Sequence, residues 1–259
     1  MRVPLVGVVT ALGRCEYNLL AEAGSSVADL NAMLAADGVD YPLEWVICCD
    51  GDASPAAVRH TLGELTVRVT VVTTPRRSGP GPARNRALME VSAPYVITLD
   101  SDDRLVPCGM RLLLAALRND TAAAWSAGRC YHVDAAGALR WVGPSDPWPP
   151  GRVAPGAFWA HKRRVGGLPF LCTATVARTA AIRACGGWPR GQRLRAEDTA
   201  LWAVLTSRFS GIWIAEHAYD YRRHSGSLTH TPGFRKLDEQ HQEIEAMIAA
   251  GTTVLPRRT

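Results

Sequence analysis

The sequence lacks the patterns that define several common classes of protein. None of its seven cysteines forms a Cys-x-x-Cys pair and several lie in apolar runs, so we expect reduced core residues, a cytoplasmic location and no zinc site. No apolar run approaches the ~18 residues that cross a bilayer, so we expect no transmembrane segment. The apolar N-terminus is interrupted by Pro4 and is followed by no small-x-small cleavage site, which favours a buried first strand over a signal peptide.

The chain also lacks a long basic block. Its net charge is +5 and its pI is about 9.0, a mildly basic balance that suits anionic partners such as nucleotide phosphates. Because no Lys/Arg run is interleaved with aromatic residues, no nucleic-acid partner is expected. With 259 residues, 47% of them hydrophobic and 20% charged, the chain has the composition of a folded globular protein.

Strands and helices alternate in the first hundred residues. Apolar runs predict strands over 6–10, 43–49, 67–72 and 95–99, and helical patterns predict helices over 27–37, 54–64 and 83–91. This alternation is typical of an α/β fold with a mostly parallel sheet. Polar residues follow three strand ends, at Thr10, Asp50 and Asp100–Asp103, and the carboxyl ends of parallel strands line a ligand cleft.

The pattern changes after Pro107. The expected elements are helices over 107–118, 179–185, 197–208 and 234–250, and strands over 122–132, 139–142, 212–215 and 219–222. Asp134–Gly137 is a hairpin signal between two of these strands. Residues 143–156 contain five prolines and Trp148, and predict a long surface loop that acts either as a lid or as a connector.

Three carboxylates crowd the stretch Asp100-Ser101-Asp102-Asp103 directly after a buried strand. They repel one another unless a cation or hydrogen-bond donors lie among them. An ordinary turn before a helix is the alternative, because Asp and Ser are common turn residues.

Several further motifs occur at intervals along the chain. They are Cys49-Asp50-Gly51-Asp52, Gly81-Pro82-Ala83-Arg84-Asn85-Arg86-Ala87, Gly186-Gly187-Trp188, Ala196-Glu197-Asp198 and Tyr221-Arg222-Arg223-His224-Ser225-Gly226-Ser227. Together with the acidic stretch, in this order, they resemble glycosyltransferase family 2, the inverting enzymes with a GT-A fold. The resemblance covers about residues 4–230. It implies a single GT-A domain over 1–259: a nucleotide-sugar-binding half (1–103), an acceptor-binding half (104–230) and a C-terminal helix and tail (231–259).

The resemblance implies a donor site for a nucleotide-diphosphate sugar. Its residues would be Thr10, Ala11, Asp50, Arg84, Asp100, Ser101, Asp102, Gly187 and Trp188. Asp50 would pair with a uracil-type base, although Cys49 stands where the family usually has a second acid, so the base stays open. Asp102 would bind Mn²⁺ or Mg²⁺, hard ions that prefer oxygen ligands, and His224 is a further candidate ligand.

The resemblance also assigns the catalytic acids. Asp198 would be the general base that takes a proton from the acceptor, and Glu197 would hold it or contact the acceptor, because inversion requires in-line attack. Local alternatives remain for these positions. Asp50 suits a turn, Arg84 a solvated helix start, Glu197 and Asp198 a helix N-terminus, Gly186-Gly187 a helix end, Trp188 packing and His224 a structural role.

These patterns indicate a metal-dependent, inverting glycosyltransferase, with a UDP-sugar as the expected donor. A nucleotidyltransferase should carry a glycine-rich, lysine-containing loop after the first strand, whereas Thr10-Ala11-Leu12-Gly13-Arg14 has one glycine and no lysine. A non-catalytic sugar-nucleotide binder is the other alternative, and the presence of both Asp102 and Asp198 counts against it. A soluble small molecule, saccharide or peptide is the expected acceptor. Trp141, Trp148 and Trp159 should shape its pocket.

Overall fold

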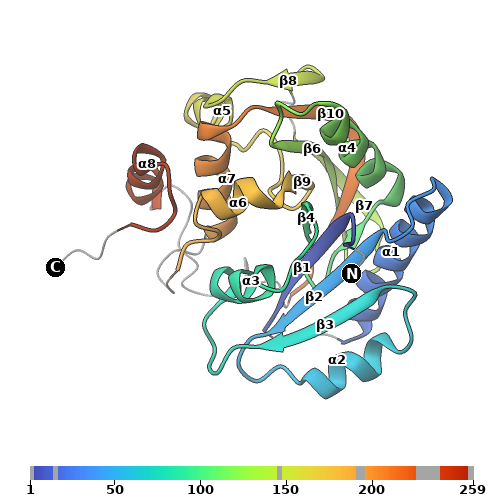
Figure 1. The fold of residues 1–259 in the computed structure, drawn as a ribbon. Coiled ribbons are helices and arrows are strands. Elements are labelled where there is room, and N and C mark those ends of the chain that lie inside the picture. Colours follow the sequence, from blue (N-terminus) through green and yellow to red (C-terminus); the bar gives the residue numbers. More distant parts are fainter. Residues whose placement is uncertain (1–2, 14–16, 145–147, 191–195, 226–239, 256–259) are drawn as a thin grey trace.

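A single sheet of ten strands runs through both halves of the chain. The structure is a computed structural model that describes residues 3–13, 17–144, 148–190, 196–225 and 240–255. The strand order is β3-β2-β1-β4-β9-β6-β10-β5, with β7 paired to β6 and β8 paired to β10. Helices cover both faces of this sheet (Figure 1).

The first half has the predicted alternation of strands and helices. Its elements are β1 (Val6–Leu12), α1 (Tyr17–Ala36), β2 (Leu43–Cys49), α2 (Pro55–Leu62), β3 (Arg68–Thr73), α3 (Pro80–Leu88) and β4 (Tyr95–Thr98). The four strands pair in parallel. Ser54 caps α2 through a 3.3 Å hydrogen bond from the Ala57 amide, and Pro55 occupies the first helical position.

The second half adds mostly antiparallel pairings to the same sheet. Its elements are β5 (Arg104–Leu105), α4 (Pro107–Asn119), β6 (Trp125–Val133), β7 (Leu139–Gly143), β8 (Gly151–Val153), α5 (Ala157–Val165), β9 (Thr175–Arg178), α6 (Thr179–Ala184), α7 (Glu197–Arg208), β10 (Gly211–Arg222) and α8 (His241–Ala250). β9 runs antiparallel to both β4 and β6, so β6 and its parallel neighbour β10 point in the same direction as β4. The predicted α/β fold with a mostly parallel nucleotide-binding sheet is therefore confirmed.

Two apolar cores stabilise the two faces of the sheet. One core joins α1, α2 and α4 to the sheet around the fully buried Trp45. The other core joins α3, α6 and α7 to the opposite face around Trp125, Trp188 and Trp213. Because helices cover both faces, the central strands are apolar runs without polar alternation, as in β1 and β2.

Three boundaries differ from the sequence-based prediction for reasons of packing. α1 begins at Tyr17 rather than near residue 27: Gly24 weakens the helical signal, yet a Cβ there would lie 2.8 Å from Leu62 of α2. α3 begins at Pro80 rather than Ala83. β10 is one strand rather than two, because register shifts on either side of His217 interrupt the apolar pattern.

The structure also tests the predictions for the loop, the final helix, the cysteines and a membrane span. The predicted loop 143–156 contains β8, and the sequence patterns did not predict α5 or β9. The predicted final helix 234–250 is described only from residue 240, and α8 occupies 241–250. The six cysteines among the described residues are free thiols, five of them buried, and Cys15 lies outside that part. No helix in the described ranges is long and apolar enough to cross a membrane.

Gly109, in the first turn of α4, provides a test of how closely α4 packs on β10. A Cβ at this position would lie 1.9 Å from the carbonyl oxygen of His217. We expect Gly109→Ala to lower the melting temperature, because an overpacking cost of about 1–3 kcal/mol exceeds the gain in helix propensity of about 1 kcal/mol. Gly167→Ala is the control, since a Cβ there meets no atom within 4 Å. Equal melting temperatures for the two variants, measured by calorimetry, would contradict this packing.

Candidate active site

A buried guanidinium connects three segments that lie far apart in the sequence. Arg84 of α3 donates to Asp100 after β4 and to Glu197 at the start of α7, each at 2.6 Å. Burial lowers the pKa of Arg84, but the charges of Asp100 and Glu197 outweigh burial and raise it. The predicted nucleotide-binding and catalytic segments therefore meet around one cation, and Arg84 is a buried residue rather than a solvated one.

The two acids at the start of α7 have environments that favour proton exchange. Burial, opposed by Arg84, raises the pKa of Glu197 to about 7. Burial also raises the pKa of Asp198, and the negative charge of Asp100 adds to this effect. The Thr199 amide donates to Asp198 Oδ1 at 2.6 Å and so orients the carboxylate. A partly exposed carboxylate with a raised pKa is suited to take a proton near neutral pH.

The three acids after β4 have different surroundings. Asp103 is buried, and it accepts hydrogen bonds from the Tyr219 hydroxyl at 2.9 Å and the Arg222 amide at 2.7 Å. Burial and the neighbouring acids raise its pKa. Tyr219 also accepts from the Asp100 amide at 3.1 Å. Asp103 thus fixes the loop to β10, and the N-cap of α4 is Val106.

Asp102 and His224 form the candidate metal pair. His224 Nε2 lies 2.8 Å from Asp102 Oδ2. Burial and the charge of Asp100 raise the pKa of Asp102, so a cation at this point would relieve the crowding of the carboxylates. Among the described residues no three His, Cys, Asp or Glu side chains converge as metal ligands. The pair fits an ion such as Mg²⁺ or Mn²⁺ that takes its other ligands from a diphosphate and water.

Asn85 holds the backbone opposite this cluster. Its side chain accepts from the Trp188 amide at 2.9 Å and donates to the Trp188 carbonyl at 2.7 Å. A Cβ on Gly187 would lie 2.2 Å from Asn85 Oδ1, and the φ of +73° also favours glycine. The predicted Gly187 is therefore required for this close approach. The Trp188 ring is 1% exposed, which favours packing over stacking on a sugar.

The predicted donor-site residue Thr10 has both of its side-chain hydrogen-bond partners within the sheet. The Thr10 hydroxyl is fully buried; it donates to the Leu99 carbonyl at 2.7 Å and accepts from Trp45 Nε1 at 2.9 Å. It therefore ties β1 to its neighbours, while the adjacent Ala11 and the predicted Ser101 are half-buried.

Asp50 organises the loop that leads into α3. It accepts hydrogen bonds from the Thr74 and Ser78 hydroxyls and from the Ser78 and Gly79 amides, at 2.6–2.8 Å. Burial raises the pKa of Asp50, but these four donors outweigh burial and lower it. The geometry supports the turn alternative for Asp50, and its pairing with a base remains a prediction.

Three residues that sequence reasoning missed hold the predicted site residues in place. Asn85, Tyr219 and Arg222 received no role, although Asn85 and Arg222 stand inside the matching motifs. Arg222 is buried, donates to the Asp102 carbonyl at 3.0 Å and also pairs with Glu22. No local sequence signal marks Tyr219, because its partners lie more than a hundred residues away.

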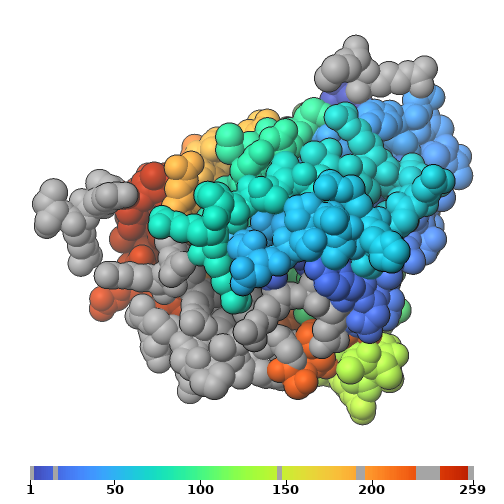
Figure 2. Space-filling view, turned by 90° about the horizontal axis from the view of Figure 1, so that it is seen from below, coloured from blue at the N-terminus to red at the C-terminus, as the bar shows by residue number. Residues whose placement is uncertain are grey.

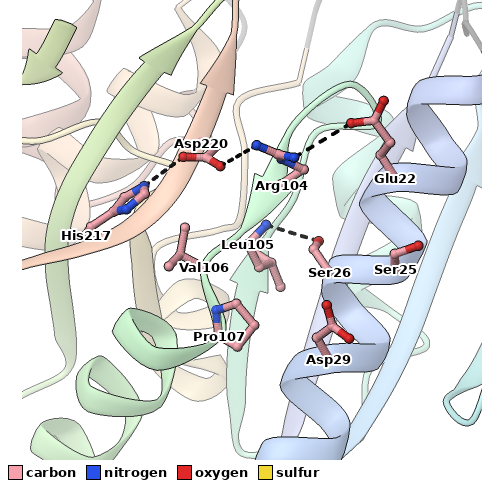
Figure 3. A pocket seen from close by; sticks show the side chains of 10 residues that line it. All are labelled: Glu22, Ser25, Ser26, Asp29, Arg104, Leu105, Val106, Pro107, His217 and Asp220. Atoms are coloured by element: carbon pink, nitrogen blue, oxygen red, sulfur yellow. Dashed lines mark hydrogen bonds and ion pairs between the residues drawn. The ribbon is translucent and has the colours of Figure 1, made fainter. Parts of the chain in front are cut away.

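A pocket of about 420 Å³ lies elsewhere, between α1, β5, the start of α4 and β10 (Figure 3). A chain of charged groups crosses it: His217 bonds Asp220 at 2.7 Å, and Arg104 bonds Asp220 at 2.9 Å and approaches Glu22 at 3.9 Å. None of the predicted site residues lines this pocket. Its charged groups join β5 and α1 to β10 and so support the loop that carries Asp102.

Structural comparison shows known proteins with this fold. The structure of S. aureus TarS 1–349 in complex with UDP-GlcNAc matches with a TM-score of 0.71 and 18% identity, over 95% of this chain and 66% of that chain. The complex of TarS 1–349 with UDP matches with a TM-score of 0.65 and 18% identity, over 95% of this chain and 65% of that chain. At this identity the likeness shows the fold.

Sequence comparison provides the family. The succinoglycan biosynthesis protein ExoO of Rhizobium meliloti (strain 1021) is 32% identical over 113 residues, which are 44% of this chain and 30% of that protein. This chain thus spans less than a third of ExoO and about two thirds of the TarS structures. A family model described as glycosyl transferase family 2 matches residues 8–159. Because that match covers more than half of the sequence, the chain belongs to glycosyl transferase family 2.

Proposed function

We propose that the protein transfers a sugar from a nucleoside-diphosphate donor, with UDP as the expected nucleotide, to an acceptor hydroxyl with inversion. The observation that carries the proposal is the buried Arg84, which brings Asp100 and Glu197 to one point beside Asp198. Family membership and the UDP and UDP-GlcNAc complexes of TarS support the donor class. The single GT-A domain, the cytoplasm as location and a soluble acceptor stay our predictions.

In this reaction Asp198 takes the proton of the acceptor hydroxyl while that oxygen attacks the anomeric carbon. The bond between that carbon and the diphosphate breaks on the opposite side, and the nucleoside diphosphate leaves with the bonding electrons. Asp102 and His224 would hold a divalent cation, and such an ion would supply positive charge to offset the negative charge of the departing diphosphate. Glu197, paired with Arg84, fixes the start of α7 and so the position of Asp198.

The comparisons favour this activity over the two alternatives. A nucleotidyltransferase would not account for the family match, and the carboxylate with a raised pKa at Asp198 has no task in a non-catalytic binder. Hydrolysis of a UDP-sugar in the absence of acceptor separates an enzyme from a binder, because water then takes the place of the acceptor hydroxyl. A protein that binds UDP but never releases it from UDP-sugars would support the binder.

Asp198→Asn tests the general base. The amide cannot take a proton, so we expect release of UDP from UDP-GlcNAc or UDP-glucose to fall by about 10²–10⁴-fold. UDP binding, measured by calorimetry, should persist because Asp198 faces the acceptor. The matched control is Asp29→Asn, an exposed carboxylate in the pocket of Figure 3. Undiminished turnover in Asp198→Asn would remove this residue from the mechanism.

Asp102→Ala tests the metal site. In the unmodified protein we expect UDP affinity to fall at least about tenfold, or 1.4 kcal/mol, when Mn²⁺ is replaced by a chelator. In Asp102→Ala the two affinities should be equal, since the carboxylate that holds the ion is gone. Calorimetric titrations of UDP with and without Mn²⁺ measure both, with Asp29→Ala as the control. An unmodified protein that binds UDP equally well under both conditions would refute metal dependence.

The raised pKa of Asp198 predicts a pH dependence. A general base works when deprotonated, so UDP release should rise with pH through a limb that lies above the ordinary Asp value of about 3.9. The residual activity of Asp198→Asn should lack this limb. Rates measured between pH 4 and 8 decide the matter: a limb that persists in Asp198→Asn assigns the titration to another group.

A further inference from the structure

Trp141 is the one exposed tryptophan of this chain. All eight tryptophans lie in the described residues, and Trp141 on β7 is 43% exposed. Of the other two that were expected to shape the acceptor pocket, Trp159 is 5% exposed. Trp148 is half-buried and packs edge-on against His161 and Phe170. Of the three tryptophans expected at the acceptor, Trp141 therefore has the side chain most accessible to a ligand.

The Trp141 ring is held flat by a stack of aromatic groups. His132 of β6 lies parallel to it, with centroids 3.5 Å apart and an interplanar angle of 11°, and Tyr221 packs edge-on against His132 at 5.1 Å. Gly143 leaves room for both rings: a Cβ there would lie 3.0 Å from Trp141 and 3.3 Å from His132. Because His132 covers one face of the indole, the exposed area lies on the opposite face and the edge.

His132 has an unusual environment for a purely structural residue. It is 5% exposed, and neither ring nitrogen has a hydrogen-bond partner. Burial, with the nearby charge of Arg223, lowers its pKa to about 4, so the imidazole is neutral near pH 7. A buried polar ring without partners costs stability and calls for a reason. A rigid, uncharged support for Trp141 supplies one.

This aromatic stack lies at the same edge of the sheet as the candidate active site. β6 runs in the direction of β4, so the β6–β7 hairpin extends from the edge that carries Asp100. Arg222 donates to the Ala135 carbonyl at the hairpin turn at 2.7 Å and to the Asp102 carbonyl at 3.0 Å. Tyr221 precedes His224 by three residues, a span of at most about 10 Å.

We propose that the exposed face of Trp141 binds a pyranose ring of a saccharide acceptor, an inference that rests on the proposed transfer reaction. A pyranose presents a face of C–H groups that buries apolar surface against an indole, while its hydroxyls remain in water. An indole that is already rigid loses little conformational freedom on binding. The stacked rings are themselves uncharged near pH 7, which suits a neutral sugar, and Arg222 links this hairpin to the loop that carries Asp102.

The test observes Trp141 directly. Protein labelled with ¹⁵N-tryptophan gives indole N–H signals, and Trp141→Phe assigns that of Trp141. Cellobiose, maltose and N,N′-diacetylchitobiose are the pyranose probes, and the open-chain polyol D-glucitol is the matched control ligand. We expect a saturable shift of the Trp141 signal with at least one disaccharide at millimolar concentrations, and no such shift with D-glucitol. Leu139→Ala, on the same strand and 54% exposed, should retain the response.

The strength of the contact is measured with the disaccharide that binds best. Replacing the indole by Ala in Trp141→Ala should weaken its binding about tenfold, whereas Leu139→Ala should leave it unchanged. No saturable shift with any of the three disaccharides overturns the inference. So does a shift of equal size with D-glucitol, or a Trp141 signal that depends on protein concentration, which would indicate a second copy on this face.

The outcomes also separate this inference from the proposed reaction. If the unmodified protein releases UDP from a UDP-sugar while no disaccharide shifts Trp141, the inference fails and the reaction stands. If disaccharides shift Trp141 but neither UDP binding nor UDP release is found, the reaction fails. The contact with Trp141 is then a saccharide-binding site without the acceptor role, which refutes the inference as stated.

Discussion

The candidate active site of this fold depends on the charge of Arg84. A guanidinium buried in the middle of α3 is stabilised by Asp100 and Glu197, which both bond it at 2.6 Å. Removing the guanidinium would take its cationic partner from the buried Glu197, and breaking a buried pair in this way costs about 3–5 kcal/mol. The same contacts determine how close α7 lies to the loop after β4. Arg84 therefore couples the stability of this region to the geometry that brings Asp198 near Asp100.

A second buried arginine performs the corresponding task on the other side of the acidic loop. Arg222 bonds the Asp102 carbonyl, the Ala135 carbonyl at the hairpin turn and Glu22 of α1. The hydrogen bond from the Tyr219 hydroxyl to Asp103 also attaches the loop to β10. The three acids within these four positions thus have different partners and different roles. Asp103 holds the loop to β10, whereas Asp100 bonds Arg84 and Asp102 lies against His224.

The sequence predicts those features that are local. Apolar runs followed by acids place Asp100 and Asp102 at strand ends, and the motif order leads to the family and to Glu197–Asp198. The pairing of Arg84 with Glu197 could not be predicted, because 113 residues separate them and each looks like an ordinary helix-start residue. The hydrogen bond from the Thr10 hydroxyl to the Leu99 carbonyl could not be predicted either, because 89 residues separate the two. α5 and β9 were missed because their burial depends on distant partners.

The two halves of the chain differ in how regular their contacts are. The first half is built from regular β-α units, so its polar residues recur at strand ends and can be identified from the sequence. The second half is held by irregular contacts, such as the stack of Trp141 on His132, whose members come from a hairpin and the end of β10. Exposed aromatic residues on a hairpin are free to change without disturbing the sheet. An acceptor contact at Trp141 would therefore allow a new acceptor preference to arise while the Arg84 cluster stays intact.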